Sequence, residues 1–401
     1  MRWKYQPLVE ITINQGRLIH NLEVHQKASG LPVAPVLKSN AYGHGLLEVA
    51  KILANEKVPF LVVDSYHEAL ILRNKGIRTP ILIIGFSAFE NIYHNQIGRR
   101  LKDVAFTFSS LEQIKEISKN LQKPTAFHLK IDTGMHRQGV LSVELSEALE
   151  LIHRNPHIRL EGVCSHLADG ENEFTSTTDE QIRVWHEALT LCEKACTGHN
   201  HKNGTDPVSP IKWQHLSASS GIFHSQKIRA NVMRLGLGLY GISSNPKRDE
   251  NNGQVLDLLP VLEMHSIISG TKKIRAGAEI GYNGTFTAPT SMTIAPIPAG
   301  YFEGSDRRWS TKGFVKIVSK ATTSEPKHSH FCPIVGLISM NITTIDISAL
   351  PEFETKIGTA VTLISSDPKD KNSVAEIARL DQTIPYEILI HIPQQLRRKI
   401  I

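Results

Sequence analysis

A lysine at position 38 is the first residue whose setting could support chemistry. The apolar, β-prone run from Val33 to Leu37 predicts a strand that ends at Lys38, and a Gly-containing turn then opens a helix at about Leu46. A free amine with a pKa of about 10.4 is protonated and a poor nucleophile, but burial or neighbouring cations can lower that pKa enough for Schiff-base chemistry. Lys38 is therefore a candidate for a covalent bond to a carbonyl compound, although a lysine just past a strand is more often a surface side chain.

Other reactive side chains fall at the ends of later predicted strands, among them His166 and Arg234. By itself, a histidine after a strand is more often structural, and an arginine there is more often a salt-bridge partner. The segments 215–221 and 234–241 are rich in small residues, which let backbone N–H groups approach a phosphate. A Ser/Gly-rich loop alone is usually only a turn.

The elements that would position these residues alternate between strand and helix. Short β-rich runs are predicted at 32–38, 60–65, 81–85, 104–108, 126–132, 158–167, 211–217 and 231–237. Helical patterns are predicted at 15–29, 45–57, 66–76, 89–99, 111–121, 141–155, 179–196 and 240–244. This alternation predicts an α/β fold with an eight-stranded parallel β/α barrel, in which chemistry gathers at the carboxyl ends of the strands. A doubly wound open sheet is the alternative.

The character of the sequence changes after a polar, turn-rich stretch at 243–253. Beyond it, short β-like segments at 261–268, 292–297, 313–318, 334–338, 343–347 and 360–364 predict a mostly-β C-terminal domain, with short helices at 372–379 and 386–391. A further strand is predicted at 8–13. The expected domains are a barrel over 9–243 and a C-terminal domain over 244–401 that also takes 1–8.

Composition excludes several classes of protein. The chain has 401 residues, of which 40% are hydrophobic and 21% charged, as in ordinary globular proteins long enough for two cores. The formal charge is +6, but the basic residues are scattered and aromatics are only 6%, so no nucleic-acid partner is expected. No apolar run approaches the length needed to span a membrane, and the N-terminus has no signal-peptide core, which predicts a cytoplasmic protein.

Four cysteines in a chain of this length are too few for a disulfide scaffold, and we expect them to be reduced. Cys192 and Cys196, followed by His199 and His201, loosely suggest a metal site. Because the spacing matches no common zinc pattern, a helix end followed by a polar loop is the better interpretation, and no metal is predicted.

The decapeptide Val36-Leu37-Lys38-Ser39-Asn40-Ala41-Tyr42-Gly43-His44-Gly45 resembles the pyridoxal phosphate lysine motif of alanine racemases. Further segments that resemble motifs of this family are 130–139, 164–168, 215–221, 234–241, 279–284, 300–307, 338–341 and 383–389. The matches run in the right order from Leu8 to Arg398. The resemblance implies an enzyme, a pyridoxal phosphate-dependent amino-acid racemase of fold type III that interconverts L-alanine and D-alanine for peptidoglycan.

The resemblance also implies the residues that hold the cofactor. Lys38 would form the internal aldimine, and Tyr42, Ser219, Tyr386 and the backbone of Gly236 and Leu237 would bind the phosphate. Arg234 would face the pyridine nitrogen. An arginine cannot deliver a proton there, because its pKa exceeds 12, and it therefore leaves a weaker electron sink that disfavours side reactions.

Racemisation needs two proton handlers, because a base that removes the α-proton from one face cannot return it to the other. Lys38 can serve one face. The resemblance implies that Tyr282 serves the other, reaching the active site from the second subunit of a homodimer, with its pKa of about 10 poised by a hydrogen-bonded chain through His166 and Arg234.

The family pattern implies contacts to the amino-acid substrate as well. Arg137 would interact with the cofactor's phenolic oxygen and the substrate carboxylate. Lys130 matches a lysine that is often carbamylated in the family, where it holds that arginine. Tyr301 would line the entrance, and the backbone of Met340 would bind the substrate carboxylate.

Several positions depart from the usual sequence motifs of the family. Ala218 replaces an asparagine before the phosphate serine, Leu235 a proline, Asn283 a glycine after Tyr282, and Asn341 an aspartate after Met340. These departures bear on rate and substrate range more than on the type of reaction.

Two other functions remain open on the sequence alone. One is a related racemase acting on serine or a basic amino acid. The other is a non-catalytic pyridoxal phosphate-binding protein on the same barrel, although such carriers lack the C-terminal domain and its tyrosine. A related decarboxylase would need a catalytic cysteine and an acidic partner for the pyridine nitrogen, which cannot be placed here.

Overall fold

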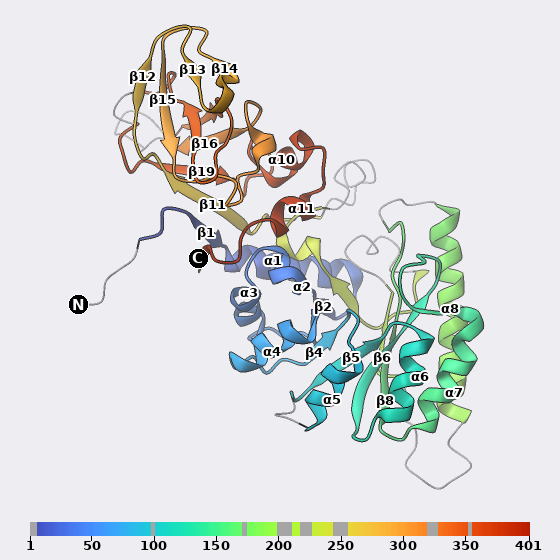
Figure 1. Cartoon of the computed structure of the whole chain (residues 1–401). Helices are drawn as coiled ribbons and strands as arrows, with labels where there is room; N and C mark the ends of the chain where they lie inside the picture. The colour runs from blue at the N-terminus through green and yellow to red at the C-terminus, as the bar shows by residue number, and fades with distance from the viewer. Residues whose placement is uncertain are drawn as a thin grey trace. The chain divides into compact units, whose positions relative to one another are not determined.

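The computed structural model describes residues 6–97, 101–170, 175–198, 211–216, 227–243, 256–318, 328–351 and 355–401. The chain divides into two compact units (Figure 1). The barrel unit comprises residues 19–41 and 49–258, and the β unit comprises residues 1–18, 42–48 and 259–401. Each is described separately.

The strands of the barrel unit confirm the predicted series of eight parallel strands. They are β2 (Val33–Pro35), β3 (Leu61–Val63), β4 (Ile81–Ile83), β5 (Val104–Phe108), β6 (Thr125–Asp132), β8 (Ile158–Cys164), β9 (Trp213–His215) and β10 (Met233–Leu235). The sheet runs β3-β4-β5-β6-β8-β9, with the short β7 (Val140–Leu141) beside β6, and β10 pairs with β2. Most of these strands are buried apolar runs, as expected for a parallel sheet covered by helices.

Backbone hydrogen bonds continue around the remaining junctions of the barrel. A parallel bridge joins Val36 to Val62 next to β2 and β3, and the Leu37 N–H donates to the Val62 carbonyl at 2.7 Å. On the other side, the N–H of Asn231, just before β10, donates to the carbonyl of Gln214 in β9 at 3.0 Å. The last strand, β10, therefore lies next to the first, β2, and their carboxyl ends meet.

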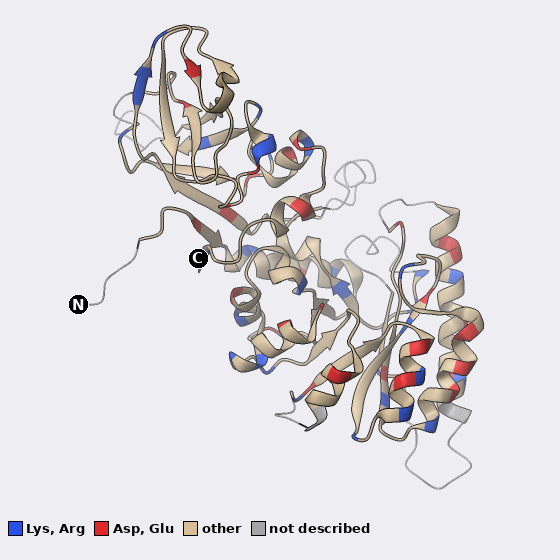
Figure 2. Cartoon of the chain, viewed as in Figure 1, with Lys and Arg blue, Asp and Glu red and all other residues tan. Residues whose placement is uncertain are grey.

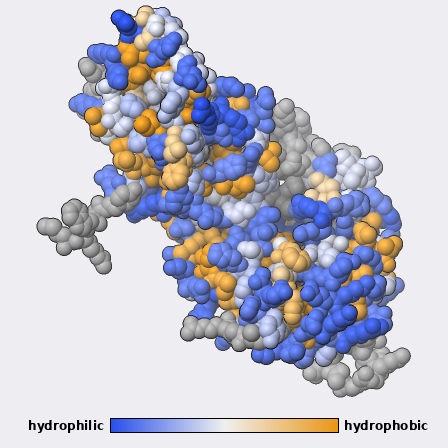
Figure 3. All heavy atoms as spheres, in the orientation of Figure 1, coloured by the Kyte–Doolittle hydropathy of each residue, from blue (hydrophilic) through white to orange (hydrophobic). Residues whose placement is uncertain are grey.

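Helices follow the strands of the barrel unit: α3 (Leu46–Leu53), α4 (Tyr66–Asn74), α5 (Phe89–Ile97), α6 (Leu111–Asn120), α7 (Leu145–Arg154) and α8 (Ser176–Gly198), after α1 (Gln15–Ser29). In α7 the buried residues are Leu145, Ala148, Leu149 and Ile152, the spacing of one helical face. Acidic and basic residues are interspersed along α6, α7 and α8 (Figure 2), and the surface over them is mainly hydrophilic in the view of Figure 3. This agrees with scattered rather than concentrated basic charge.

The helix predicted at 240–244 is wrong. After β10 the chain instead makes a 3₁₀ turn, η4, at Leu237–Tyr240, and leaves it at Gly241, which has a left-handed φ of 80°. Three glycines in six residues from Gly236 to Gly241 disfavour an α-helix, because glycine loses the most backbone entropy in one.

The β unit contains a six-stranded sheet in the order β17-β16-β19-β11-β1-β20. Its strands are β1 (Glu10–Ile13), β11 (Leu262–Ile267), β16 (Phe314–Val318), β17 (Ser329–Pro333), β19 (Ala360–Ile364) and β20 (Arg397–Ile400). A three-stranded sheet is formed by β12 (Lys272–Ile274), β15 (Met292–Ile297) and β18 (Thr343–Asp346), and a hairpin by β13 (Glu279–Ile280) and β14 (Phe286–Thr287). Both ends of the chain thus contribute a strand, since β1 pairs in parallel with β20 and antiparallel with β11.

Most of the predicted strands of this unit are confirmed, but the strand at 334–338 is wrong. The pairing strand is β17, and only Ile334 makes an isolated bridge, to Ile345. Glycine at 336, with a φ of 73°, turns the chain away from the sheet. The two short helices are present as α10 (Val374–Leu380) and α11 (Pro385–Ile390). The N-terminal end of α10 is capped by the side chain of Ser373.

The fold is the predicted one, a parallel β/α barrel followed by a mostly-β region. The domain limits at 243 and 244 lie at the edge of the described residues and stay a prediction. No helix in the described part of the chain is long and apolar enough to cross a bilayer.

Candidate active site

Lys38 follows β2 and begins an unusual turn. The turn, α2 (Lys38–Tyr42), has left-handed backbone angles at four consecutive non-glycine residues, Ser39, Asn40, Ala41 and Tyr42, with φ between 51° and 56°. Each residue in this conformation costs roughly 1–2 kcal/mol, so the rest of the fold must hold the turn in place. Backbone strain of this kind is concentrated at functional sites in proteins, and here it directly follows the predicted reactive lysine.

The surroundings of Lys38 favour a neutral amine. Burial lowers the pKa of Lys38, the carboxylate of Asp64 opposes this, and the charges of Arg137 and Arg234 lower the pKa further. The next residue is fixed by α4, because the Ser39 N–H donates to the carboxylate of Glu68 at 2.8 Å. A neutral lysine is the form that attacks a carbonyl group or accepts a proton.

Arg234 lies in β10, in register with Ala34 of β2, and its side chain is only 3% exposed. Its Nη2 donates to the carbonyl of Ser165 at 2.7 Å and to that of Leu216 at 3.2 Å, while Nη1 donates to the carbonyl of His215 at 2.8 Å. The guanidinium is therefore held by backbone oxygens after β8 and at the end of β9. This fixes a permanent positive charge at the carboxyl end of the barrel.

A pair of buried histidines continues from Arg234 into the barrel and was not predicted. Nη1 of Arg234 also donates to Nδ1 of His215, and Nε2 of His215 lies 2.8 Å from Nδ1 of His128. Burial, followed by the charge of Arg234, lowers the pKa of His128 to about 3 and that of His215 well below its usual value. Both rings are neutral. The available signal was His128 itself, a polar residue between the apolar residues Phe127 and Leu129 of β6.

His166 and Lys130 lie in the same neighbourhood. Nδ1 of His166 is 3.4 Å from Nη2 of Arg234, and burial together with nearby cations lowers the pKa of His166 to about 3. Nζ of Lys130 donates to the side chain of Gln138 at 3.0 Å. Burial, and then the charges of Arg234 and Arg137, lower the pKa of Lys130. The structure thus brings the predicted cationic residues of the barrel unit into one electrostatic cluster, although the side chain of Arg137 is exposed.

The predicted phosphate loop after β10 is firmly positioned. Gly236 precedes the η4 turn, in which Leu237 is buried, and Tyr240 donates from its hydroxyl to the carbonyl of Val36 at 2.8 Å. This bond ties the loop to the segment that carries Lys38. Ser219, predicted to bind the phosphate, and the departure at Ala218 lie outside the described residues.

Tyr42 and Tyr386, both predicted near the phosphate, lie together in the β unit. Their rings are 5.8 Å apart between centroids and tilted by 47°. Gly43 permits this arrangement, because a Cβ at that position would lie 1.9 Å from the carbonyl oxygen of Leu389 in α11. Gly43 is therefore packed directly against α11, the helix that carries Tyr386.

Tyr282 begins a short 3₁₀ turn, η5 (Tyr282–Gly284), and its side chain is 63% exposed. Asn283 has a φ of 60°, in the left-handed region that asparagine tolerates better than most residues. The departure from glycine at Asn283 is thus compatible with the backbone the turn needs.

Tyr301 and Met340 lie on adjoining loops. The Tyr301 N–H donates to the Ser339 carbonyl at 3.1 Å, and the Phe302 N–H donates to the Met340 carbonyl at 2.9 Å. The amide of Asn341, the departure from aspartate, donates to the carboxylate of Glu303 at 2.8 Å. An aspartate at 341 would instead place two carboxylates together.

No cluster of three or more metal-ligating side chains occurs within the described ranges. Cys192 and Cys196 are both buried in α8, while His199 and His201 lie outside those ranges.

A barrel with a lysine of lowered pKa after its first strand and a buried arginine on its last, together with a mostly-β region, is typical of the barrel enzymes that bind pyridoxal phosphate through a lysine. Comparison with known proteins agrees. A family model described as alanine racemase, N-terminal domain, matches residues 13–244, and one described as alanine racemase, C-terminal domain, matches residues 261–400. The chain belongs to the alanine racemase family.

Individual relatives match over nearly their whole length. The chain is 31% identical to alanine racemase 2 of Caldanaerobacter subterraneus subsp. tengcongensis, over 97% of this chain and 93% of that protein. Among solved structures, an alanine racemase of Clostridium difficile matches with a TM-score of 0.83 and 28% identity, over 99% and 97% of the two chains. An alanine racemase of Bacillus anthracis with bound L-Ala-P matches with a TM-score of 0.82 and 29% identity, over 99% and 96%.

The alanine racemase family depends on pyridoxal phosphate, and the residues present fit this cofactor. Lys38 has the lowered pKa that bonding to an aldehyde requires. The buried guanidinium of Arg234 supplies a donor that cannot protonate a pyridine nitrogen.

Proposed function

We propose that this chain is an alanine racemase that interconverts L-alanine and D-alanine and supplies D-alanine for peptidoglycan. The observation that carries the proposal is the placement of Lys38 and Arg234 after β2 and on β10, two hydrogen-bonded strands whose carboxyl ends meet. The amine has a lowered pKa, and the guanidinium is immobilised. The bound L-Ala-P of the Bacillus anthracis relative supports an amino-acid substrate.

We assign the cofactor contacts as follows. Lys38 would hold the cofactor covalently, Arg234 would donate to its ring nitrogen, and Tyr42, Ser219, Tyr386 and the backbone of Gly236 and Leu237 would bind its phosphate. Bound pyridoxal phosphate supplies an electron sink for the α-carbon.

Two side chains of the protein move the α-proton. Lys38, whose pKa is lowered by burial, accepts or returns the proton on one face. Tyr282 serves the opposite face. His166, 3.4 Å from Arg234, cannot readily take up a proton itself and therefore acts as a neutral hydrogen-bonding partner in the chain that orients Tyr282.

Substrate binding is assigned to residues around these two bases. Arg137 takes the carboxylate and the cofactor's phenolic oxygen, with Lys130 holding Arg137. The lowered pKa of Lys130 supports its carbamylation, because a neutral amine is the form that reacts with carbon dioxide. Tyr301 lines the entrance, and the backbone of Met340 binds the substrate carboxylate.

We further propose a homodimer in which each active site takes Tyr282 from the second copy. The β unit carries exposed large side chains at Tyr282, Tyr301, Phe302, Met340 and Ile342. Backbone hydrogen bonds join Tyr301 to Ser339 and Phe302 to Met340, so four of these residues belong to two adjoining loops. Exposed apolar side chains grouped in this way are typical of an interface.

A cytoplasmic location is consistent with the cysteines. All four are unpaired and buried, as expected in a reducing compartment.

The test is chiral analysis of each L-amino acid after incubation with purified protein and pyridoxal phosphate. We expect L-alanine to approach equal amounts of both enantiomers. If L-serine or a basic amino acid is converted faster than L-alanine, that amino acid takes the place of alanine as the proposed substrate. The absence of any racemisation would overturn the proposal. A Lys38→Ala variant should lose the visible absorbance of the bound cofactor, whereas Lys51→Ala, an exposed lysine on α3, should keep it.

A further inference from the structure

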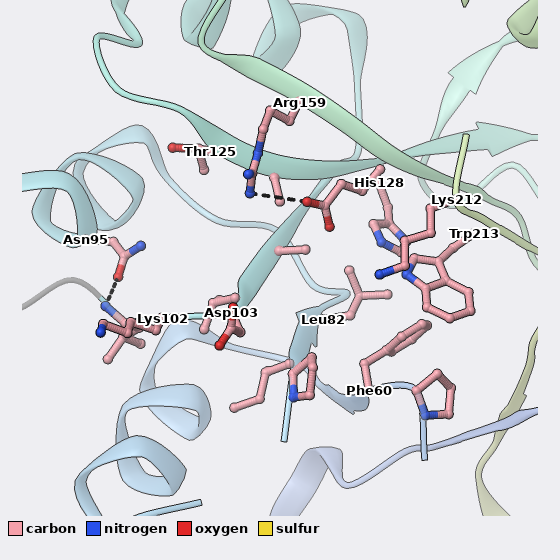
Figure 4. Close-up of a pocket in the computed structure, with 18 residues that line it drawn as sticks. Phe60, Leu82, Asn95, Lys102, Asp103, Thr125, His128, Arg159, Lys212 and Trp213 are labelled. Atoms are coloured by element: carbon pink, nitrogen blue, oxygen red, sulfur yellow. Dashed lines mark hydrogen bonds and ion pairs between the residues drawn. The ribbon is translucent and has the colours of Figure 1, made fainter. Parts of the chain in front are cut away.

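A cavity of about 490 Å³ opens at the amino end of the barrel (Figure 4). Residues at the start of the parallel strands or just before them form much of its wall, including Phe60 before β3, Val104 in β5, Thr125 in β6 and Lys212 before β9. Lys38 follows β2 and Arg234 lies on β10, and neither residue lines the cavity. The cavity is therefore separate from the proposed active site.

Small side chains create the space. Ala105 and Ala126 face each other in register on β5 and β6, and both line the cavity. Next to them, the aromatic rings of Phe60 and Trp213 meet edge to face, with centroids 5.3 Å apart. The two alanines thus leave space beside the two rings, where large branched side chains are usual inside such barrels.

His128, only 2% exposed, lines this cavity and faces it with a hydrogen-bond donor. Arg234 can only donate, so Nδ1 of His215 must accept, and the proton of neutral His215 must sit on Nε2. That Nε2 donates to Nδ1 of His128, which places the proton of His128 on its own Nε2. No hydrogen-bond partner for Nε2 of His128 is found among the described residues.

The orientation of His128 is fixed by its neighbours. Gly162 lies opposite it in register on β8, and a Cβ at Gly162 would come within 2.5 Å of the His128 ring. Phe60 packs edge-on against the same ring at 5.8 Å between centroids. The ring therefore cannot easily turn its donor away from the cavity.

The charges around the cavity favour an anion. Three cations, Lys102, Arg159 and Lys212, line it against two carboxylates, Asp103 and Glu161. One carboxylate is already paired, because Arg159 and Glu161 are 3.2 Å apart. In Figure 4 Lys212 lies beside Trp213, and its Nζ is 5.1 Å from the centre of that ring.

We propose that this cavity is a binding site for a small aromatic carboxylate. Its ring packs beside the rings of Phe60 and Trp213, its carboxylate accepts a hydrogen bond from Nε2–H of His128, and Lys212 contributes positive charge. Binding there does not depend on the proposed racemase activity, so the two proposals can fail separately.

Benzoate is the probe, and benzamide, which has nearly the same shape but no charge, is its comparison. Titration calorimetry on the cofactor-loaded protein, with the active site saturated by alanine, measures binding of each. We expect saturable binding of benzoate at one site per chain and binding of benzamide that is at least about threefold weaker.

Variants locate the site. Ala126→Leu fills the cavity and should weaken benzoate binding at least about tenfold, equivalent to a loss of about 1.4 kcal/mol. Lys212→Met, at an exposed position, should weaken it about threefold, whereas Lys119→Met on the outer surface of α6 should not change it. If Ala126→Leu does not fold, the comparison of benzoate binding between Lys212→Met and Lys119→Met tests the proposal instead.

Three results would overturn the proposal: no saturable benzoate binding, binding that alanine displaces, or binding unaffected by Ala126→Leu and Lys212→Met. Equal binding of benzamide would also overturn it, because the charge of the ligand would then play no part.

Discussion

Nδ1 of His128 lies 2.8 Å from Nε2 of His215 in the interior of the barrel, and the second ring accepts a hydrogen bond from Arg234. Because the guanidinium keeps its charge, neither ring can be protonated without placing a second positive charge in a buried space. The pair is thus a rigid, neutral support behind the arginine that we place at the cofactor's ring nitrogen.

This support makes stability depend on pH. In the unfolded chain a histidine has a pKa of about 6.5. In the folded chain burial, followed by the charge of Arg234, lowers the pKa of His128 and of His166 to about 3, and that of His215 is also lowered. Between these values the unfolded state binds more protons. The stabilisation is therefore complete above pH 6.5 and is lost as the pH falls towards 3.

Urea denaturation of the cofactor-loaded protein at pH 7.5, 6.0 and 5.0 checks this dependence. Replacing one such histidine, His128→Gln, should reduce the slope of unfolding free energy against pH below 6.5 by about 1.4 kcal/mol per pH unit. His67→Gln, at an exposed position on α4, should leave the slope unchanged. Parallel slopes for all three proteins would contradict the neutral pair.

We expect any replacement of Gly43 to lower the stability of the fold. A comparison with Gly76 separates the two causes of this loss. Both have positive φ, 80° and 84°, but a Cβ at Gly43 would meet the Leu389 carbonyl, whereas at Gly76 nothing lies within 4 Å. Gly76→Ala should cost only the backbone strain, about 1–2 kcal/mol. Gly43→Ala should cost more than about 3 kcal/mol, because the clash adds to the strain. Urea midpoints measure both, and similar losses would contradict the contact with α11.

Asn283 provides a test of the backbone next to Tyr282. Asn283 has a φ of 60°, which glycine adopts without strain, so Asn283→Gly should keep the turn and the rate of racemisation. Asn283→Val should distort the turn and slow racemisation at least about tenfold, since a β-branched residue is a strong outlier there. Steady-state rates with L-alanine distinguish the two, and the cofactor's visible absorbance should be the same in both. A fast Asn283→Val variant would show that the turn does not position Tyr282.

The sequence predicted the barrel well because its signals are local. Each strand is a short apolar run between turns, and each helix has an apolar face, so eight of eight parallel strands were found. The same signals failed where glycine decides the backbone, at Gly236 to Gly241 and at Gly336. The edge strand β20 was also missed, since Arg397–Ile400 is mostly polar and pairs with β1, which lies at the other end of the chain.

The resemblance predicted the candidate site residues but not the residues that hold them in position. His128 and His215 interact across 87 positions of sequence, and no local pattern reports such a contact. The left-handed turn from Ser39 to Tyr42 was equally hidden, because none of its four residues is a glycine. Both features hold functional side chains in place through tertiary contacts, which sequence periodicity does not encode.

The origin of the second base can be tested by mixing two inactive variants. Tyr282→Phe should keep the cofactor's absorbance but lose turnover by roughly 10²–10⁴-fold, more severely when L-alanine is the substrate, whereas Tyr93→Phe on α5 should be fully active. Lys38→Ala lacks the other base. If each site takes Tyr282 from the second copy, a mixed dimer of the two variants contains one intact site.

Co-refolding the two variants in equal amounts should restore about one quarter of the wild-type activity, since half of randomly formed dimers are mixed and each has one intact site of two. The visible absorbance should appear only in the share of chains that retain Lys38. If Tyr282 instead serves the Lys38 of its own chain, every site in every mixture lacks one base and no activity returns. A mixture as inactive as its components would therefore exclude a shared active site, while leaving the assignment of the two bases open to the single variants.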